Sequence, residues 1–122
     1  MKDTTQKPGR RALIVTAKTL VADDLKDILL GKGFMAVDAV MDPIDMPDAR
    51  YDVAFLDIPV ARVLGDARLR AMQDGGTSII ILNGLSKDTI QRNAGILVLS
   101  QPFRTDDVHE ILMRAEADGG DR

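Results

Sequence analysis

The sequence predicts an α/β domain built on a doubly wound, five-stranded parallel sheet. Short apolar runs rich in valine, isoleucine and leucine recur along the chain, which is the pattern of strands buried on both faces. Segments of helical character separate these runs, and strands that alternate with helices favour a parallel sheet with right-handed crossovers. The predicted strands are 12–16, 35–41, 53–57, 78–83 and 95–99.

Length and composition are those of a single domain. The chain has 122 residues, and a chain of this length buries roughly two thirds of its unfolded surface without needing a disulfide or a metal. We therefore expect one domain over residues 11–117, with loose ends at 1–10 and 118–122. Cysteine is absent and histidine occurs once, which disfavours disulfides, a thiol nucleophile and a zinc site.

Charge and hydropathy restrict the partners and the location. The formal net charge is −3 and the pI is near 5.0, whereas nucleic-acid-binding domains usually present a basic face. No apolar run approaches the roughly 20 residues that span a bilayer, and the first residues lack the apolar stretch of a signal peptide. We therefore expect a soluble, cytoplasmic domain that binds neither nucleic acid nor membrane.

Helices are expected between the strands. Apolar residues recur at helical spacing from Leu20 to Leu29, and Gly31 and Gly33 supply a stop. The other predicted helices are 62–76, ended by Gly75 and Gly76; 86–93, with Ser86 as N-cap; and 105–117, capped by Thr105 or Asp106.

One connection is predicted to lack a helix. The segment "DPIDMPDAR" (42–50) carries Pro43 and Pro47 four residues apart, and proline inside a helix removes a backbone donor and causes a clash. We therefore predict a loop or at most one turn. Met41 and Met46 lie beside these prolines, and they either plug the gap that the absent helix leaves or form an adaptable exposed surface.

Ligands of such a sheet collect beyond the carboxyl ends of its strands. The residues expected there are 16–19, 57–60, 83–86 and 101–103. In "YDVAFLDIPV" an apolar run ends on a carboxylate, Asp57. Ser86 and Ser100 have no plausible base near them in the sequence, and the glycine-rich phosphate-binding patterns are absent, so we expect no enzyme.

The chain resembles a response-regulator receiver domain from Arg11 to about Ala117. "ALIVTAKTLVADDLKDILLGKGF" is similar in rhythm to the first strand and helix of that family, and "YDVAFLDIPV" to the third strand, which ends on the phosphoacceptor aspartate. "ILVLSQPF" is similar to the fifth strand, where the family has Lys-Pro and an apolar or aromatic residue. The resemblance implies a flavodoxin-like receiver fold of strand order 2-1-3-4-5, with Asp57 at the phosphoacceptor position.

The site positions depart from the family pattern. Thr16 and Ala17 stand where the family has two acidic residues that hold magnesium, Asn83 replaces a serine or threonine, and Gln101 replaces the lysine. Magnesium prefers carboxylate and phosphate oxygens, and the loss of one charge-stabilising group commonly costs about 10²–10³ in rate. We therefore expect weak or absent magnesium binding, no other cofactor, and poor phosphorylation of Asp57.

Three explanations for the retention of Asp57 stay open. The residue is left over from an active ancestor or caps the following turn; it pairs with Lys18, which would place an ammonium where the family has its metal ion; or it is still phosphorylated. An exposed pair of this kind contributes only about 0–1 kcal/mol.

The resemblance leads to a function hypothesis. We interpret the chain as a stand-alone pseudo-receiver, a phosphorylation-independent protein-interaction module in bacterial two-component signal transduction. Its partners would be signalling proteins, namely a histidine kinase or a downstream effector, or a second copy that forms a homodimer through the face of the last helix. Charges of both signs on that face suit a two-fold contact and equally an ordinary solvated surface. His109 on this helix is expected to be solvated.

Two alternatives remain. The chain could be a functional single-domain response regulator that accepts phosphate at Asp57 from a histidine kinase in a phosphorelay. More distantly, it could bind a small molecule in the strand-end crevice through Thr16, Asn83 or Gln101. The sequence leaves open whether the Gln101–Pro102 bond is cis.

Overall fold

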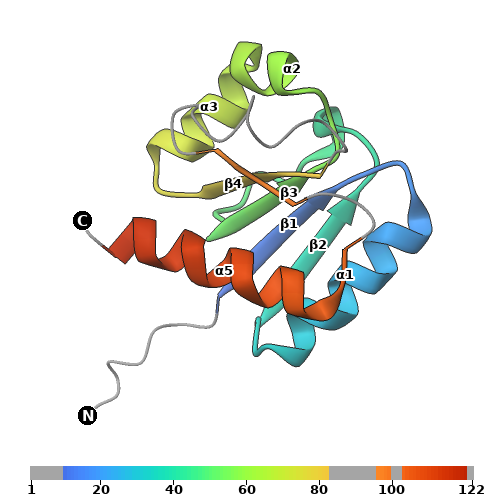
Figure 1. The fold of residues 1–122 in the computed structure, drawn as a ribbon. Helices are drawn as coiled ribbons and strands as arrows, with labels where there is room; N and C mark the ends of the chain where they lie inside the picture. Colours follow the sequence, from blue (N-terminus) through green and yellow to red (C-terminus); the bar gives the residue numbers. More distant parts are fainter. Residues whose placement is uncertain (1–9, 83–95, 100–102, 121–122) are drawn as a thin grey trace.

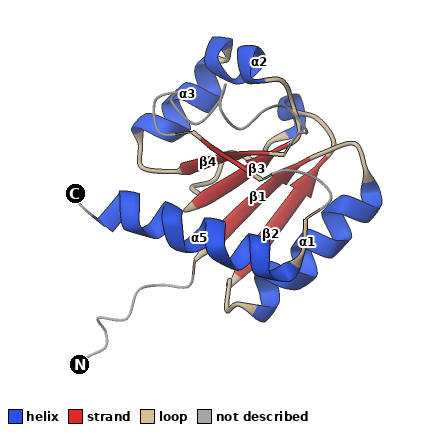
Figure 2. Ribbon diagram, viewed as in Figure 1, coloured by secondary structure: helices blue, strands red, loops and turns tan. Residues whose placement is uncertain are grey.

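The computed structural model describes residues 10–82, 96–99 and 103–120. Within these ranges, five parallel strands form one sheet in the order β2-β1-β3-β4-β5 (Figures 1 and 2). The predicted fold class and strand order are therefore confirmed. The strands are β1 (Arg11–Val15), β2 (Ala36–Val40), β3 (Val53–Leu56), β4 (Ser78–Ile81) and β5 (Leu97–Val98).

The central strands are buried because the helical layers cover both faces of the sheet. In β1, every residue from Ala12 to Val15 is fully buried, and β3 is buried along its whole length. The edge strand β2 is only partly buried, which agrees with its more alternating sequence. In register, Ile14 of β1 lies between Ala39 of β2 and Phe55 of β3.

Two apolar layers hold the sheet. Helices α1 (Thr19–Gly31) and α5 (Thr105–Gly120) cover one face, where residues such as Leu25 and Val108 pack against Phe55 (Figure 2). Helices α2 (Val60–Gly65) and α3 (Ala67–Asp74) lie against the other face, with Leu69 packed on Leu56. Burial of these side chains is the main stabilising contribution to the fold.

Helix α1 follows its prediction closely. It ends at Gly31, and the backbone N–H of Lys32 donates back to the carbonyls of Ile28 and Leu29. Gly33 then takes a φ of +92°, a left-handed conformation that glycine adopts without steric cost. The predicted stop at Gly31 and Gly33 is therefore confirmed.

Helix α5 begins as predicted, but its cap differs. Neither Thr105 nor Asp106 is seen to cap it. Asp107 Oδ2 instead accepts a 2.9 Å hydrogen bond from the backbone N–H of Arg104, one position before the helix. This is the reach-back half of a capping box, in which the third helical residue satisfies the N–H of the cap residue.

The predicted helix 62–76 is in fact two helices. Asp66 interrupts it with an extended backbone (ψ 118°), and its Oδ1 accepts hydrogen bonds from the N–H groups of Arg68 (2.9 Å) and Leu69 (3.2 Å). Aspartate competes with helix formation in this way because its short side chain satisfies a new helix start. The predicted stop is confirmed, since Gly76 follows with a φ of +106°.

The connection between β2 and β3 holds a single 3₁₀ turn, η1 (Pro43–Asp45), as predicted. Asp42 caps this turn by accepting a 3.0 Å hydrogen bond from the N–H of Ile44. Of the two methionines, Met46 is buried in the core and Met41 is 66 % exposed. Met46 therefore fills the space that the absent helix leaves, as one of the two interpretations predicted. For Met41 that interpretation is wrong, because its side chain is exposed.

The predicted helix 86–93 and its cap Ser86 lie outside the described residues. Among the helices that are described, none is long and apolar enough to cross a membrane.

The cap of α3 can be tested by Asp66→Ala. Removal of the carboxylate leaves the N–H groups of Arg68 and Leu69 without their partner, and we expect a loss of about 1 kcal/mol in the free energy of unfolding. Urea denaturation measures this loss. Asp74→Ala, at the opposite end of the same helix, is the matched control, and an equal effect of the two substitutions would contradict the capping role.

Candidate functional site

Two residues that follow β1 and β3 meet at the carboxyl edge of the sheet. Val15 and Leu56 pair in parallel register, so the residues after them, Thr16 and Asp57, are neighbours. The hydroxyl Oγ1 of Thr16 donates a hydrogen bond of 2.8 Å to Asp57 Oδ2. The structure therefore places Thr16, which departs from the receiver pattern, in contact with Asp57 at the phosphoacceptor position.

Backbone hydrogen bonds fix this pair in place. The N–H of Thr16 donates to the carbonyl of Val40 at 3.0 Å, and the N–H of Asp57 donates to that of Val15 at 2.8 Å. Thr16 Oγ1 also accepts from the backbone N–H of Lys18 at 3.1 Å. Thr16 is only 3 % exposed, whereas Asp57 is half-buried. The threonine hydroxyl thus ties the loop after β1 to the carboxylate after β3.

The possible ion pair between Lys18 and Asp57 is not formed in the part of the chain that the structure describes. The side chain of Lys18 is exposed, and an exposed pair would gain little over solvation of the two charges. The hydroxyl of Thr16 is the group that contacts the carboxylate. The ion pairs between described residues join Arg11 to Asp38, Arg62 to Asp42, and Arg114 to Glu110.

Among Thr16, Ala17 and Asp57, only Asp57 offers a carboxylate to a magnesium ion. Magnesium requires near-octahedral oxygen ligands and is commonly held by one or two carboxylates. Asp57 supplies one carboxylate, the Thr16 hydroxyl is engaged with it, and the exposed Ala17 supplies no donor. Across residues 10–82, 96–99 and 103–120, no three His, Cys, Asp or Glu side chains gather as a metal site.

Two of the predicted site positions, Asn83 and Gln101, lie outside the described residues, as does the Gln101–Pro102 bond. His109 is exposed on α5, as expected, and its Nδ1 lies 2.9 Å from the Nζ of Lys32. The ring nitrogen accepts from the lysine ammonium in this contact, which links α5 to the end of α1.

Solved structures, but no matching sequences, support the architecture. No protein-family model and no curated protein matches the sequence. Among solved structures, the chemotaxis response regulator CheY4 of Vibrio cholerae superposes with a TM-score of 0.70 at 20 % identity, over 88 % of this chain and 99 % of that one. The chain has the receiver-domain fold.

Two further structures share this receiver fold. A proposed pilus assembly protein (cpaE) from Burkholderia thailandensis E264 gives a TM-score of 0.67 at 18 % identity, over 88 % of this chain and 98 % of that one. A proposed pilus assembly-related protein from Burkholderia pseudomallei K96243 gives 0.63 at 16 % identity, over 88 % and 90 %. At these identities the likeness concerns the fold and not the site residues.

Sequence reasoning missed a polar cluster in which Asp38 of the edge strand β2 meets Arg11 of β1 and Tyr51, which precedes β3. Tyr51 donates its hydroxyl to Asp38 Oδ2 at 2.5 Å, and an Arg11 nitrogen lies 3.9 Å from the same oxygen. The Arg11 guanidinium also stands 5.9 Å from the centre of the Tyr51 ring. The one available signal was the charged Asp38 inside a strand pattern, but nothing local identifies its partners.

Burial, the hydrogen bond to Asp38 and the negative charge of that residue together raise the pKa of Tyr51 to about 12, and the nearby Arg11 opposes them. The neutral phenol is thus the form that the fold favours. Its contribution to stability is present below the ordinary pKa of 10.0 and is lost as the pH rises from about 10 to about 12.

Tyr51 can be titrated directly because the sequence contains one tyrosine and no tryptophan. We expect the phenolate absorbance of the folded protein to appear with a midpoint near pH 12, and that of the urea-unfolded protein near 10. Asp38→Asn should lower the folded midpoint, since it removes a neighbouring negative charge. Identical midpoints in the folded and unfolded protein would contradict the buried contact.

The Thr16 hydroxyl is tested by Thr16→Val, which conserves shape and removes both hydrogen bonds. We expect a loss of about 1–3 kcal/mol in the free energy of unfolding, because Asp57 and the N–H of Lys18 lose a buried partner. Thr16→Ser restores the hydroxyl and should recover most of the stability in the same urea titration. Equal losses in the two variants would show that the methyl group, and not the hydroxyl, matters.

Proposed function

We propose that the chain is a pseudo-receiver, a protein-interaction module of bacterial two-component signalling that acts without efficient phosphorylation of Asp57. The observation that carries this proposal is the 2.8 Å hydrogen bond from the Thr16 hydroxyl to the Asp57 carboxylate. A neutral donor occupies the place beside the carboxylate, and the neighbouring position 17 has only a methyl group.

The chemistry of phosphoryl transfer supports this interpretation. Transfer to a carboxylate brings negative groups together, so catalysis depends on positioning and on positive charge that offsets them. Thr16 and Ala17 lack the carboxylates with which a receiver holds its magnesium ion, and Gln101 lacks the positive charge of the receiver lysine. Several such losses at one site remove most of the expected rate enhancement, although their effects need not add.

Without phosphorylation, the domain would act through its surfaces. The exposed face of α5 carries charges of both signs, including Asp106, Glu110 and Arg114. Arg114 Nη2 lies 3.7 Å from Glu110 Oε2 on this face, and a pair in so exposed a position can exchange partners at low cost. Such a face suits a signalling protein or a second copy of the chain.

A second candidate is a functional response regulator. Asp57 stands at the carboxyl end of β3 and is half-buried, so its carboxylate remains open to an incoming phosphoryl group. A histidine kinase that supplied missing positive charge could use it. The solved structures with this fold include a chemotaxis response regulator, which supports this second candidate.

Intact mass after incubation with acetyl phosphate and magnesium decides between these candidates. We expect no added phosphoryl group on the folded protein, and the same result for Asp57→Asn. An added phosphoryl group that Asp57→Asn abolishes would overturn the pseudo-receiver proposal and would identify the domain as an active receiver.

Ala17→Asp provides a gain-of-function arm of the same experiment. Position 17 is exposed, so we expect the new carboxylate to be tolerated, and it follows Thr16, whose hydroxyl contacts Asp57. We expect it to bind magnesium more tightly than the parent protein in a calorimetric titration, because it supplies a second carboxylate ligand. Ala17→Asn is the matched neutral control, and no difference between the two would refute the assigned cause of weak metal binding.

A further inference from the structure

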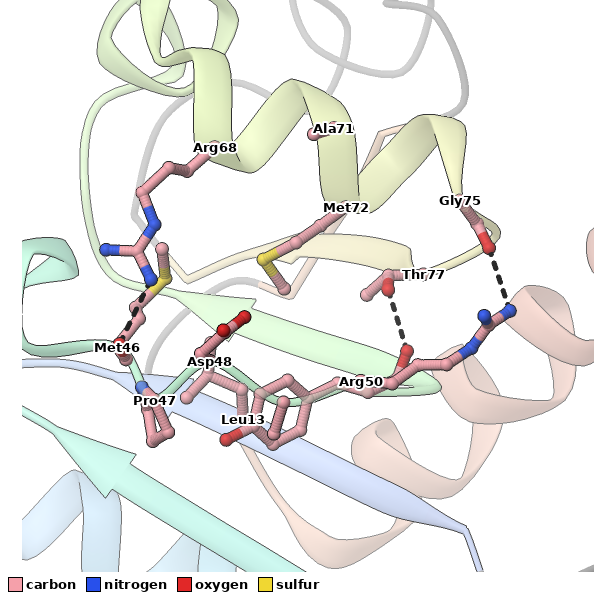
Figure 3. Close-up of a pocket in the computed structure, with 12 residues that line it drawn as sticks. Leu13, Met46, Pro47, Asp48, Arg50, Arg68, Ala71, Met72, Gly75 and Thr77 are labelled. Carbon is pink, nitrogen blue, oxygen red and sulfur yellow. Dashed lines mark hydrogen bonds between the residues drawn. The ribbon is translucent and has the colours of Figure 1, made fainter.

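A groove of about 480 Å³ lies between α3 and the segment that connects β2 to β3 (Figure 3). Its floor is apolar and comes from Leu13 of β1, the buried Met46 and Tyr51, and the half-buried Met72 of α3. The volume falls within the range of about 300–1,000 Å³ that is typical of small-molecule sites.

The groove exists because the η1 turn is smaller than a helix. Met46 fills part of the space on this face of the sheet, and the rest stays open beneath residues 47–50, whose side chains are exposed. All of the residues that line the groove belong to the described part of the chain. The groove is therefore a consequence of the same local sequence that shortened this connection.

Two arginines stand at opposite ends of the groove. Arg68 reaches from α3 to the carbonyl oxygen of Met46 (3.0 Å), and Arg50 reaches from the connecting segment to that of Gly75 (3.2 Å) (Figure 3). Both side chains are exposed and their present acceptors are neutral. A guanidinium has five N–H donors and binds a carboxylate more strongly than a carbonyl, so each arginine retains donors for an anion.

Asp48 limits what that anion can be. Its carboxylate extends toward the groove between the two arginines (Figure 3). The charges around the opening are thus two positive and one negative. A ligand with one carboxylate can pair with an arginine, whereas a second negative charge would be repelled by Asp48.

We propose that this groove binds a small amphipathic monocarboxylate, with its apolar body on Met46, Met72 and Leu13 and its carboxylate at Arg68 or Arg50. The site is separate from the receiver edge. Tyr51 and Thr77, which line the groove, precede β3 and β4, whereas Asp57 follows the carboxyl end of β3. The domain would thus have a ligand input that is independent of Asp57.

Octanoate, octylammonium and octanol are the probes, because they share an alkyl body and differ in charge. Titration of the isotope-labelled whole chain, followed by NMR chemical shifts, should show saturable binding of octanoate with shifts concentrated at Met46 and Met72. Octanoate should bind more tightly than octanol, and octylammonium more weakly than octanoate.

Charge variants test the assigned roles. One of the two substitutions Arg68→Gln and Arg50→Gln should weaken octanoate binding about tenfold, the loss expected for one charge-assisted hydrogen bond, and leave octanol unchanged. If neither substitution had an effect, the assigned role of the arginines would be overturned. Arg70→Gln, an exposed neighbour on the same helix outside the groove, is the matched control. Asp48→Asn should strengthen octanoate binding and leave octanol unchanged, a result that a merely structural role of Asp48 would not produce.

A filling variant keeps the proposal falsifiable if Arg68 proves necessary for folding. Ala71→Leu places bulk at an exposed lining position and should abolish octanoate binding, whereas Ala67→Leu, exposed on the same helix outside the groove, should not. Unsaturable binding, shifts located elsewhere, or equal affinity in these two variants would overturn the proposal. Binding of an acidic peptide with an apolar side chain, but not of octanoate, would overturn it in favour of a protein partner.

Discussion

Between β2 and β3 the chain has a single 3₁₀ turn in place of a full helix. The apolar sheet face beside this turn must still be buried, and the packing on that side follows from this constraint. Pro43 and Pro47 prevent a regular helix, so the uncovered apolar surface must be buried by other means. Met46 and Tyr51 supply the bulk from within the connection itself. Arginines of α2 and α3 then hold the connection in place, since Arg62 pairs with Asp42 (3.3 Å) and Arg68 bonds to the backbone of Met46. The edge cluster of Asp38 and Tyr51 and the open groove are both products of this substitute packing.

The carboxyl edge of the sheet depends on a different contact, the direct hydrogen bond between a hydroxyl and a carboxylate. The parallel register of β1 and β3 places position 16 beside Asp57, as the receiver architecture requires. An acidic residue at that position would repel the carboxylate unless a cation lay between them, whereas a threonine hydroxyl donates to it directly. In the proposed pseudo-receiver, the Thr16 hydroxyl would thus stand in for a metal-dependent arrangement, and the edge would satisfy its own carboxylate. A self-satisfied edge suits a domain with one conformation better than it suits a phosphorylation switch.

These two features lie at opposite ends of the sheet and share few residues. Strand β3 (Val53–Leu56) passes between them, because Tyr51 precedes it beside the groove and Asp57 follows it at the carboxyl edge. The proposed ligand groove and the carboxyl edge would therefore be separate sites, each with its own electrostatic character.

The sequence by itself determined the strands, their parallel arrangement, the short connection at 42–50 and the positions at which the receiver pattern is lost. Each of these depends on the periodicity or identity of residues that are close together in the chain. Tertiary structure alone decided three other matters: the bond between Thr16 and Asp57, the division of the helix at Asp66, and the partnership of Asp38 with Tyr51. The first and third join residues 41 and 13 positions apart, so they depend on strand register and side-chain direction. The division at Asp66 is local, but a capping aspartate and a solvent-facing helical aspartate have the same sequence signature, and only the packing of Val63 and Leu69 on the sheet distinguishes them.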